Sequence, residues 1–287
     1  MSEDLIPLEP RPVPPRLPGQ VVLRPGADDA IDAAAAEILL AALQSVRALG
    51  DFHLALSGGS TPLPLYRRLM YDPAYRQLPW ERTHLWMVDE RRVPETDERS
   101  NFGTIREIIV DHSGMPAANV HSMNALRPDA DTRYEEELRR VLARRDKGQD
   151  RLDYVLLGIG SDGHTASLFP HSPAVLSEAH AEGDAPPRLV RINSGPRVTP
   201  PDRVTLTFAA LNAARQVGVL VLGEAKRAIV ERLVSASAAS AASGDPPIEE
   251  LPILGVRPRA GTLKWFLDED ACPVANPADH SAPSTRR

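Results

Sequence analysis

Residues 154–164, with the sequence YVLLGIGSDGH, contain the pattern that decides the fold. The apolar run at residues 154–159 carries no charged side chain, and a glycine-rich polar loop continues from it. Uninterrupted apolar runs of this length are typical of strands that are buried on both faces of a mostly parallel sheet. Because ligands bind beyond the carboxyl ends of such strands, the loop after this run is the first place to look for a site.

The same alternation recurs on both sides of this stretch. Further apolar runs that predict buried strands occupy residues 21–23, 53–57, 84–89, 189–192 and 217–222. Helical patterns lie between several of them, at residues 28–49 closed by Gly50, 131–147 closed by Gly148, and 224–234. The sequence therefore predicts an α/β fold with a mainly parallel sheet that helices cover on both faces.

The chain is expected to form one catalytic domain, residues 20–270, between two flexible ends. Six prolines lie within the first eighteen residues, which predicts that residues 1–19 form a flexible, proline-rich arm. Residues 271–287 predict a flexible tail. Inside the domain, residues 235–247, SASAASAASGDPP, predict a surface loop after a fraying helix.

The composition excludes several classes of protein. Of the 287 residues, 42% are hydrophobic and 25% are charged, which excludes a largely disordered chain. The single cysteine, Cys272, excludes a disulfide framework and a thiolate metal cluster. A net charge of −6 argues against a nucleic-acid surface, and no apolar run reaches the ~18 residues of a membrane span. The amino terminus, MSEDLIPLEP, lacks the basic and apolar segments of a signal peptide, so we expect a cytoplasmic protein.

A glycine-rich loop follows the strand predicted at residues 53–57. It consists of Ser57, Gly58, Gly59, Ser60 and Thr61, and Pro62 comes next. Glycines let an anion approach closely, and Thr61 can cap a helix whose first residue is Pro62. The loop therefore predicts a phosphate cradle at a helix N-terminus, although a plain strand-to-helix turn fits the same residues. It lacks the Gly-Lys-Ser/Thr ending of a Walker loop.

Charged side chains follow two other predicted strands. Arg91 lies in the run DERRVP at residues 89–94, and a guanidinium binds oxyanions with a fork of donors. A solvated charge run would explain this stretch equally well. Lys226 lies in the first turn of the helix predicted at residues 224–234, where a cation opposes the helix dipole unless it serves an anion. Both side chains are candidate ligands of an anionic substrate.

The loop after residues 154–159 holds the side chains with the clearest chemistry. Its glycines match a dinucleotide-binding pattern, but no long helix follows and the next strand does not end in an acid, so that interpretation is rejected. His164 has no helical face to pack on, and Asp162 is near enough to orient its ring, as in a general base. An exposed structural histidine remains the alternative. The other histidines show no metal-ligand spacing, so no metal site is predicted.

Six stretches together resemble the 6-phosphogluconolactonase family, within the larger group that includes glucosamine-6-phosphate deaminase. In chain order they are LALSGGSTPLPLY, VDERRVPETDERSNF, LLGIGSDGHTASLFP, RVTLTFAALNAA, GEAK and TLKWFLDEDA. The resemblance spans about residues 20–270 and implies an α/β sandwich of the sugar-phosphate isomerase/deaminase type. It also implies a substrate, 6-phospho-D-glucono-1,5-lactone, and a reaction, the second step of the oxidative pentose phosphate pathway.

The deaminase is the nearest alternative within this resemblance. Its histidine loop typically continues to Asn-Glu-Pro, where this chain has LFP at residues 168–170, so Phe169 stands where the deaminase has the acid that helps ring opening. The deaminase also has Asp-Glu-Tyr where this chain has DER at residues 89–91. Both differences favour lactone hydrolysis over the deaminase or isomerase reaction.

The implied reaction gives each candidate residue a role. Neutral His164 takes a proton from the water that attacks the C1 carbonyl and returns it to the ring oxygen, while Asp162 holds the histidine ring. The 6-phosphate lies against the glycine-rich loop, with Lys226 and Arg203 adding charge, and Arg91 faces the polar end of the lactone. Backbone amides could supply the donors assigned to the two arginines. These steps require no metal and no other cofactor.

Two rival functions stay open to a direct test. A sugar-phosphate sensor would keep the phosphate cradle without catalysis, but the proline-rich first twenty residues cannot form the DNA-binding helix-turn-helix that such a sensor needs. A sugar-phosphate isomerase would need a carboxylate base, and Asp89 could be that base. The expected partner is therefore a small sugar-phosphate lactone, with no nucleic acid or membrane, bound by a monomer or small homo-oligomer.

Overall fold

Seven parallel strands form the central sheet of the computed structural model, which describes residues 13–179, 186–243 and 246–273. In sheet order they are β1 (Gln20–Arg24), β10 (Thr262–Asp268), β9 (Gln216–Val221), β6 (Tyr154–Leu157), β2 (Phe52–Leu56), β3 (Thr83–Met87) and β5 (Val120–His121). Each pair of neighbours runs in the same direction. The predicted parallel sheet is confirmed.

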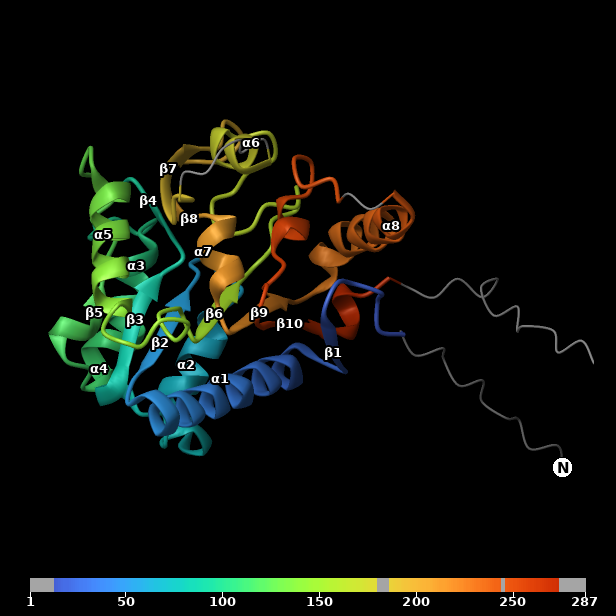
Figure 1. Cartoon of the computed structure of the whole chain (residues 1–287). Coiled ribbons are helices and arrows are strands. Elements are labelled where there is room, and N and C mark those ends of the chain that lie inside the picture. The colour runs from blue at the N-terminus through green and yellow to red at the C-terminus, as the bar shows by residue number, and fades with distance from the viewer. Residues whose placement is uncertain (1–12, 180–185, 244–245, 274–287) are drawn as a thin grey trace, which may run out of the picture.

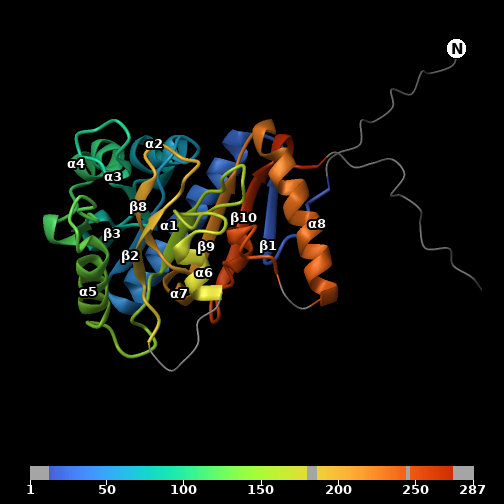
Figure 2. The same cartoon turned by 90° about the horizontal axis from the view of Figure 1, so that it is seen from above.

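Helices cover both faces of this sheet. α1 (Ala27–Leu49) and α2 (Leu63–Tyr71) lie along one face, and α7 (Phe208–Ala213) and α8 (Arg227–Ser243) lie along the other (Figures 1 and 2). The other described helices are α3 (Asn101–Ile105), α4 (Asp111–Ser113), α5 (Ala130–Leu142) and α6 (Pro173–Ala179), with a π-helical turn, Arg106–Val110, between α3 and α4. As predicted, Gly50 closes α1 as its C-cap, and its φ of 92° is a conformation that favours glycine.

A smaller antiparallel sheet lies above the central one. Its order is β4 (Asp89–Arg91), β8 (Asp202–Leu206) and β7 (Val190–Ser194). The strand predicted at residues 84–89 is therefore wrong, because these residues are divided between β3 and β4. The strand predicted at residues 189–192 is present as β7, but it belongs to this second sheet. An apolar run shows that a strand is buried, but it does not say in which sheet or direction the strand pairs.

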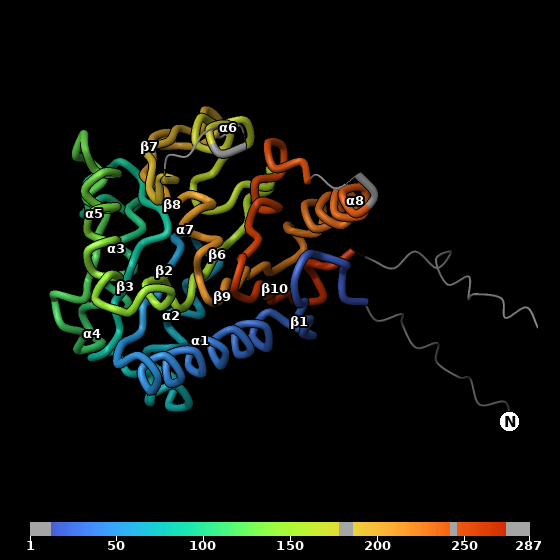
Figure 3. The backbone as a smooth tube through the Cα atoms, viewed as in Figure 1, coloured from blue at the N-terminus to red at the C-terminus, as the bar shows by residue number. Residues whose placement is uncertain are grey.

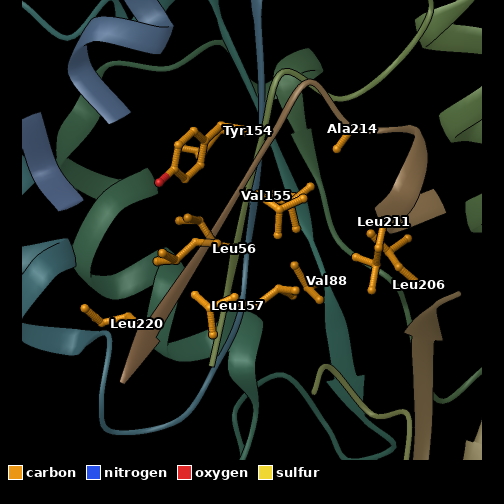
Figure 4. Close-up of a cluster of buried hydrophobic side chains, with 14 of the residues drawn as sticks. Leu56, Val88, Tyr154, Val155, Leu157, Leu206, Leu211, Ala214 and Leu220 are labelled. Carbon is orange, nitrogen blue, oxygen red and sulfur yellow. The ribbon is translucent and has the colours of Figure 1, made fainter. Parts of the chain in front are cut away.

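Apolar side chains fill the space between the two sheets. Leu206 belongs to β8 of the smaller sheet, Val88 immediately precedes β4, and Leu211 belongs to α7. These side chains pack with Val155 and Leu157 of β6 (Figure 4). All five are almost completely buried. This packing holds the strand that carries Arg91 against the carboxyl end of the central sheet.

Two helices end at other residues than predicted. α5 stops at Leu142 and not at Lys147, because the chain beyond it turns to bring the side chain of Arg145 to Asp51 and Asp153. α8 continues to Ser243, so residues 235–243 are helical and not a surface loop. That stretch contains five alanines, and their high helix propensity outweighs the lower propensity of its serines. Residues 244–245 of the predicted loop lie outside the described residues.

Much of the predicted arm and tail lies outside the described residues, namely 1–12 and 274–287. Of the arm, residues 13–19 are described, and the indole N–H of Trp265 donates to the Pro18 carbonyl at 2.7 Å. Of the tail, Ala271 and Cys272 are described and buried. Both described ends lie at the β1 edge of the sheet (Figure 3). Among the described helices, none has the length and apolar character that a membrane crossing needs.

Candidate functional site

Loops that follow four neighbouring strands, β9, β6, β2 and β3, meet at a hollow of about 370 Å³. Nine of the ten predicted site residues line this hollow: Ser57, Gly58, Gly59, Ser60, Thr61, Arg91, His164, Arg203 and Lys226. Asp162, the tenth, contacts His164 but does not line the hollow. The structure thus brings the predicted residues together, while their individual roles stay predictions.

The glycine-rich loop leaves its backbone donors free beside the hollow. Ser57 is fixed at the end of β2, because its hydroxyl donates to the Leu156 carbonyl at 2.8 Å and its own carbonyl accepts from the Tyr66 hydroxyl. The backbone N–H groups of residues 58–61 donate to no other group in the part of the chain that is described. Free amide donors at the end of a strand are what a phosphate cradle needs.

The helix after this loop begins later than predicted. α2 starts at Leu63 with Pro62 at the N-cap position, and no side chain caps it, so the predicted cap by Thr61 is wrong. A turn in which the Leu63 N–H donates to the Ser60 carbonyl comes before the helix. Thr61 keeps its place in the hollow wall without binding the helix end.

His164 and Asp162 form a close pair. The imidazole Nδ1 lies 2.5 Å from Oδ1 of Asp162, and the His164 backbone N–H donates to the same oxygen at 3.1 Å. Because an ionised carboxylate only accepts, Nδ1 carries the ring proton and Nε2 keeps its lone pair. Partial burial would raise the pKa of Asp162, but the hydrogen bond from His164 prevails and lowers that pKa to about 2. A Cβ at residue 160 would lie 2.2 Å from Nδ1 of His164, so the glycine at this position leaves room for the imidazole ring.

Lys226 lies on the wall next to the histidine loop. Its Nζ donates to the Ile159 carbonyl at 2.6 Å. Burial lowers the pKa of Lys226, although the charge of Asp162 opposes that shift. The residue belongs to a short 3₁₀ turn, Glu224–Lys226, and not to the first turn of α8 as predicted. Its charge therefore faces the hollow from the turn that follows β9.

Arg91 and Arg203 are direct neighbours across β4 and β8. Arg91 donates to the Arg99 carbonyl and Arg203 to the Pro200 carbonyl, which fixes both side chains in the wall. Burial lowers the pKa of Arg203, although the charge of Asp89 raises it. Like charges directly opposite one another destabilise a sheet, so this pair is most favourable when an anion occupies the hollow.

Sequence reasoning missed Asn101 and Ser167, which hold Asp89 in the wall. The Ser167 hydroxyl donates to Oδ2 of Asp89 at 2.6 Å, and Nδ2 of Asn101 donates to the Asp89 carbonyl at 3.0 Å. All three are buried and line the hollow. Asn101 and Ser167 lie within stretches that carry the family resemblance, but a single Asn or Ser has no spacing that reveals a role before the fold is known.

Histidines also gather at the opposite, amino end of the strands, although their spacing in the sequence shows no metal-ligand pattern. The parallel register sets His53 beside His84, and both rings lie near Asp51 at a spacing that could hold a metal ion. However, the Trp86 indole N–H donates to His53 Nδ1 at 3.0 Å, so Nε2 carries the ring proton. His53 then has no lone pair left for an ion, and this cluster does not fit a metal.

Comparison with known proteins finds relatives along most of the chain. The profile of the family described as glucosamine-6-phosphate isomerases/6-phosphogluconolactonase matches residues 25–265. The 6-phosphogluconolactonase of Mycobacterium tuberculosis is 35% identical over 251 residues, which cover 85% of this chain and 93% of the relative. That of Haemophilus influenzae is 33% identical over 223 residues, or 76% of this chain and 85% of the relative. The human GDH/6PGL endoplasmic bifunctional protein is 38% identical over 85% of this chain, which spans only 29% of its length.

Solved structures agree with the fold. The 6-phosphogluconolactonase of Thermotoga maritima has a TM-score of 0.67 and 29% identity, covering 87% of this chain and 99% of its own. The structure titled devB protein has a TM-score of 0.71 and 30% identity, covering 88% and 97%. The predicted α/β sandwich is confirmed.

Proposed function

The chain belongs to the glucosamine-6-phosphate isomerase/6-phosphogluconolactonase family, and we propose that it hydrolyses 6-phospho-D-glucono-1,5-lactone to 6-phosphogluconate. The observation that carries this proposal is the pair of His164 and Asp162 beside a hollow lined by three cationic side chains. A free imidazole nitrogen beside a site for a phosphorylated substrate suits metal-free ester hydrolysis. The reaction is the second step of the oxidative pentose phosphate pathway.

His164 is the general base in the proposed reaction. Its Nε2 takes a proton from a water molecule as that water attacks the C1 carbonyl carbon. The charged Asp162 holds the ring and stabilises the imidazolium that forms in the tetrahedral intermediate. When the intermediate collapses, the bond between C1 and the ring oxygen breaks and His164 returns the proton to that oxygen. One histidine therefore serves both steps.

The phosphate is proposed to lie against the free amides of residues 58–61. Lys226 and Arg203 add positive charge, and Arg91 faces the polar end of the lactone. Among the described residues that line the hollow, these three cations outnumber the one carboxylate, that of Asp89. An excess of positive charge favours a dianionic phosphate over a neutral sugar lactone.

Phe169 favours the lactonase over the deaminase. It stands where the deaminase loop typically carries an acid, it is 4% exposed, and its ring centroid lies 4.9 Å from that of His164. A hydrocarbon ring cannot transfer the proton that opens an amino sugar, so the ring of Phe169 shapes the hollow and takes no part in proton transfer.

A coupled assay tests this function. Glucose-6-phosphate dehydrogenase generates the lactone, and acid release is followed with and without the protein in the presence of a chelator. We expect hydrolysis well above the spontaneous rate and no ammonia from glucosamine 6-phosphate. Ammonia release at a comparable rate would move the assignment to the deaminase, and binding of 6-phosphogluconate without hydrolysis would indicate a sensor.

A further inference from the structure

The carboxylate of Glu90 is buried beside the hollow and accepts four hydrogen bonds. Oε1 accepts the backbone N–H groups of Arg91 at 2.7 Å and Asn101 at 2.8 Å. Oε2 accepts the backbone N–H of Phe102 at 2.7 Å and the hydroxyl of Ser100 at 3.1 Å. Glu90 is only 5% exposed and does not line the hollow itself.

These four bonds join two segments that form one wall of the hollow. Arg91 lies on β4 and Asn101 at the start of α3, and both side chains line the hollow. Asn101 also presses on the glycine-rich loop, because a Cβ at Gly58 would lie 1.7 Å from its Oδ1. Through Asn101, the buried carboxylate thus sets the position of the loop proposed to hold the phosphate.

We propose that Glu90 is a positioning residue, which holds Arg91, Asn101 and the glycine-rich loop in the arrangement that binds the substrate; this inference rests on the proposed lactonase function. A carboxylate suits the task because it only accepts, and it meets four donors here. A glutamine of the same size replaces one acceptor by an NH₂ group, which faces N–H donors and cannot bond with them.

The expected effect is on binding more than on chemistry. Glu90 lies outside the hollow, and the groups that it positions are proposed to contact the sugar and the phosphate in both the ground state and the transition state. Loss of such uniform binding raises KM and leaves kcat nearly unchanged. A purely structural role would instead lower the stability of the fold and leave the KM of the folded protein unchanged.

Glu135 provides a matched control for Glu90→Gln. It is 8% exposed, and it accepts the backbone N–H groups of Leu189 and Val190 at 3.0 and 3.3 Å, but it lies away from the hollow. We expect Glu90→Gln to raise the KM for 6-phosphogluconolactone about tenfold, with kcat within about threefold of the parent. Glu135→Gln should lower the melting temperature and leave KM unchanged.

Two results would overturn the positioning role: an unchanged KM in folded Glu90→Gln, or an equal rise of KM in Glu135→Gln. If Glu90→Gln does not fold, Ser100→Ala decides, because it removes one of the four bonds to Glu90 and should raise KM about threefold. An unchanged KM in Ser100→Ala would then contradict the proposal. If the parent protein hydrolyses no lactone, the proposed function fails, and that outcome is distinct from either of these.

Discussion

The central sheet has a histidine next to a carboxylate at each of its two ends, and the two pairs differ in what surrounds them. At the carboxyl end, the side chains of His164 and Asp162 are 26% and 31% exposed, and Nε2 has no partner among the described residues. At the amino end, the His53 side chain is fully buried, with Nδ1 bonded by Trp86 and Nε2 3.5 Å from Asp51.

The comparison shows that solvent access and a free ring nitrogen, more than the histidine–carboxylate pair itself, decide what the pair can do. Burial lowers the pKa of His53, although the nearby carboxylate of Asp51 opposes this shift, and the ring packs in the core. His164 has one nitrogen fixed by Asp162 and the other free to accept a proton beside the hollow. One pair is suited to proton transfer and the other to holding strands together.

The largest expected effect on kcat comes from replacing Asp162, the acid that orients His164 at the carboxyl end. In Asp162→Asn the amide can donate to Nδ1, which favours the proton on Nε2 and removes the base. We expect kcat for the lactone to fall by about 10² to 10⁴ while the melting temperature changes little. Kinetics and thermal unfolding of the same preparation provide the check. A kcat within about threefold of the parent would show that Asp162 does not orient His164.

At the amino end, Arg145→Met should act on stability alone. The Arg145 side chain is 4% exposed and pairs with Asp153, itself 1% exposed, at 2.7 Å. Removing one partner of a buried ion pair costs about 3–5 kcal/mol when the other charge is left unpaired. Because Arg215 still pairs with Asp153 at 3.0 Å, we expect a loss of stability below that range. Urea unfolding should show this loss, with kcat unchanged for the folded protein. A drop in kcat without a loss of stability would contradict the division between the two ends.

The sequence predicted the carboxyl end better than the amino end for a physical reason. Residues 57–61 and His164 follow apolar runs directly, so the parallel-strand rule brings them together without knowledge of the strand order. The cluster of His53 and His84 depends on the register between β2 and β3, and the bond between Arg145 and Asp153 depends on where α5 ends. Neither can be read from local pattern. Cytoplasmic location, oligomeric state and the absence of a nucleic-acid partner stay predictions.

Acid should weaken the amino end before it affects Asp162. Burial and the charges of His53 and His121 lower the pKa of His84 to about 4 from the usual 6.5. Between these values the unfolded chain binds more protons than the folded one, so stability falls as pH falls from 6.5 to 4. Each unit by which the pKa of His84 is lowered corresponds to about 1.4 kcal/mol, so the free energy of unfolding should fall by about 3 kcal/mol over this pH range. Asp162, with its pKa of about 2, stays ionised throughout.

Urea titrations at pH 7 and pH 4.5 measure this loss, and His84→Gln should make the free energy of unfolding less dependent on pH. If the parent unfolds with the same free energy at both values, the buried histidines are not held neutral.

The smallest effect concerns the phosphate contact. Lys226→Ala removes a cation from the hollow and should cost about 1.5–3 kcal/mol of binding, raising KM by about one to two decades with kcat little changed. Lys264→Ala is the control. Nζ of Lys264 lies 2.5 Å from Oε1 of Glu37, and neither residue lines the hollow. Steady-state kinetics of both variants provide the test. If the KM of Lys226→Ala equals that of Lys264→Ala, Lys226 does not contact the phosphate.

The most direct test of the account is kcat for 6-phosphogluconolactone, corrected for spontaneous hydrolysis, in His164→Asn and in His53→Asn. We predict that His164→Asn folds normally, still binds 6-phosphogluconate and loses about 10² to 10⁴ in kcat. His53→Asn should unfold at a lower temperature but keep kcat within about twofold. A His164→Asn protein that retains about half of the parent kcat would contradict the account and direct attention to Asp89 as the base.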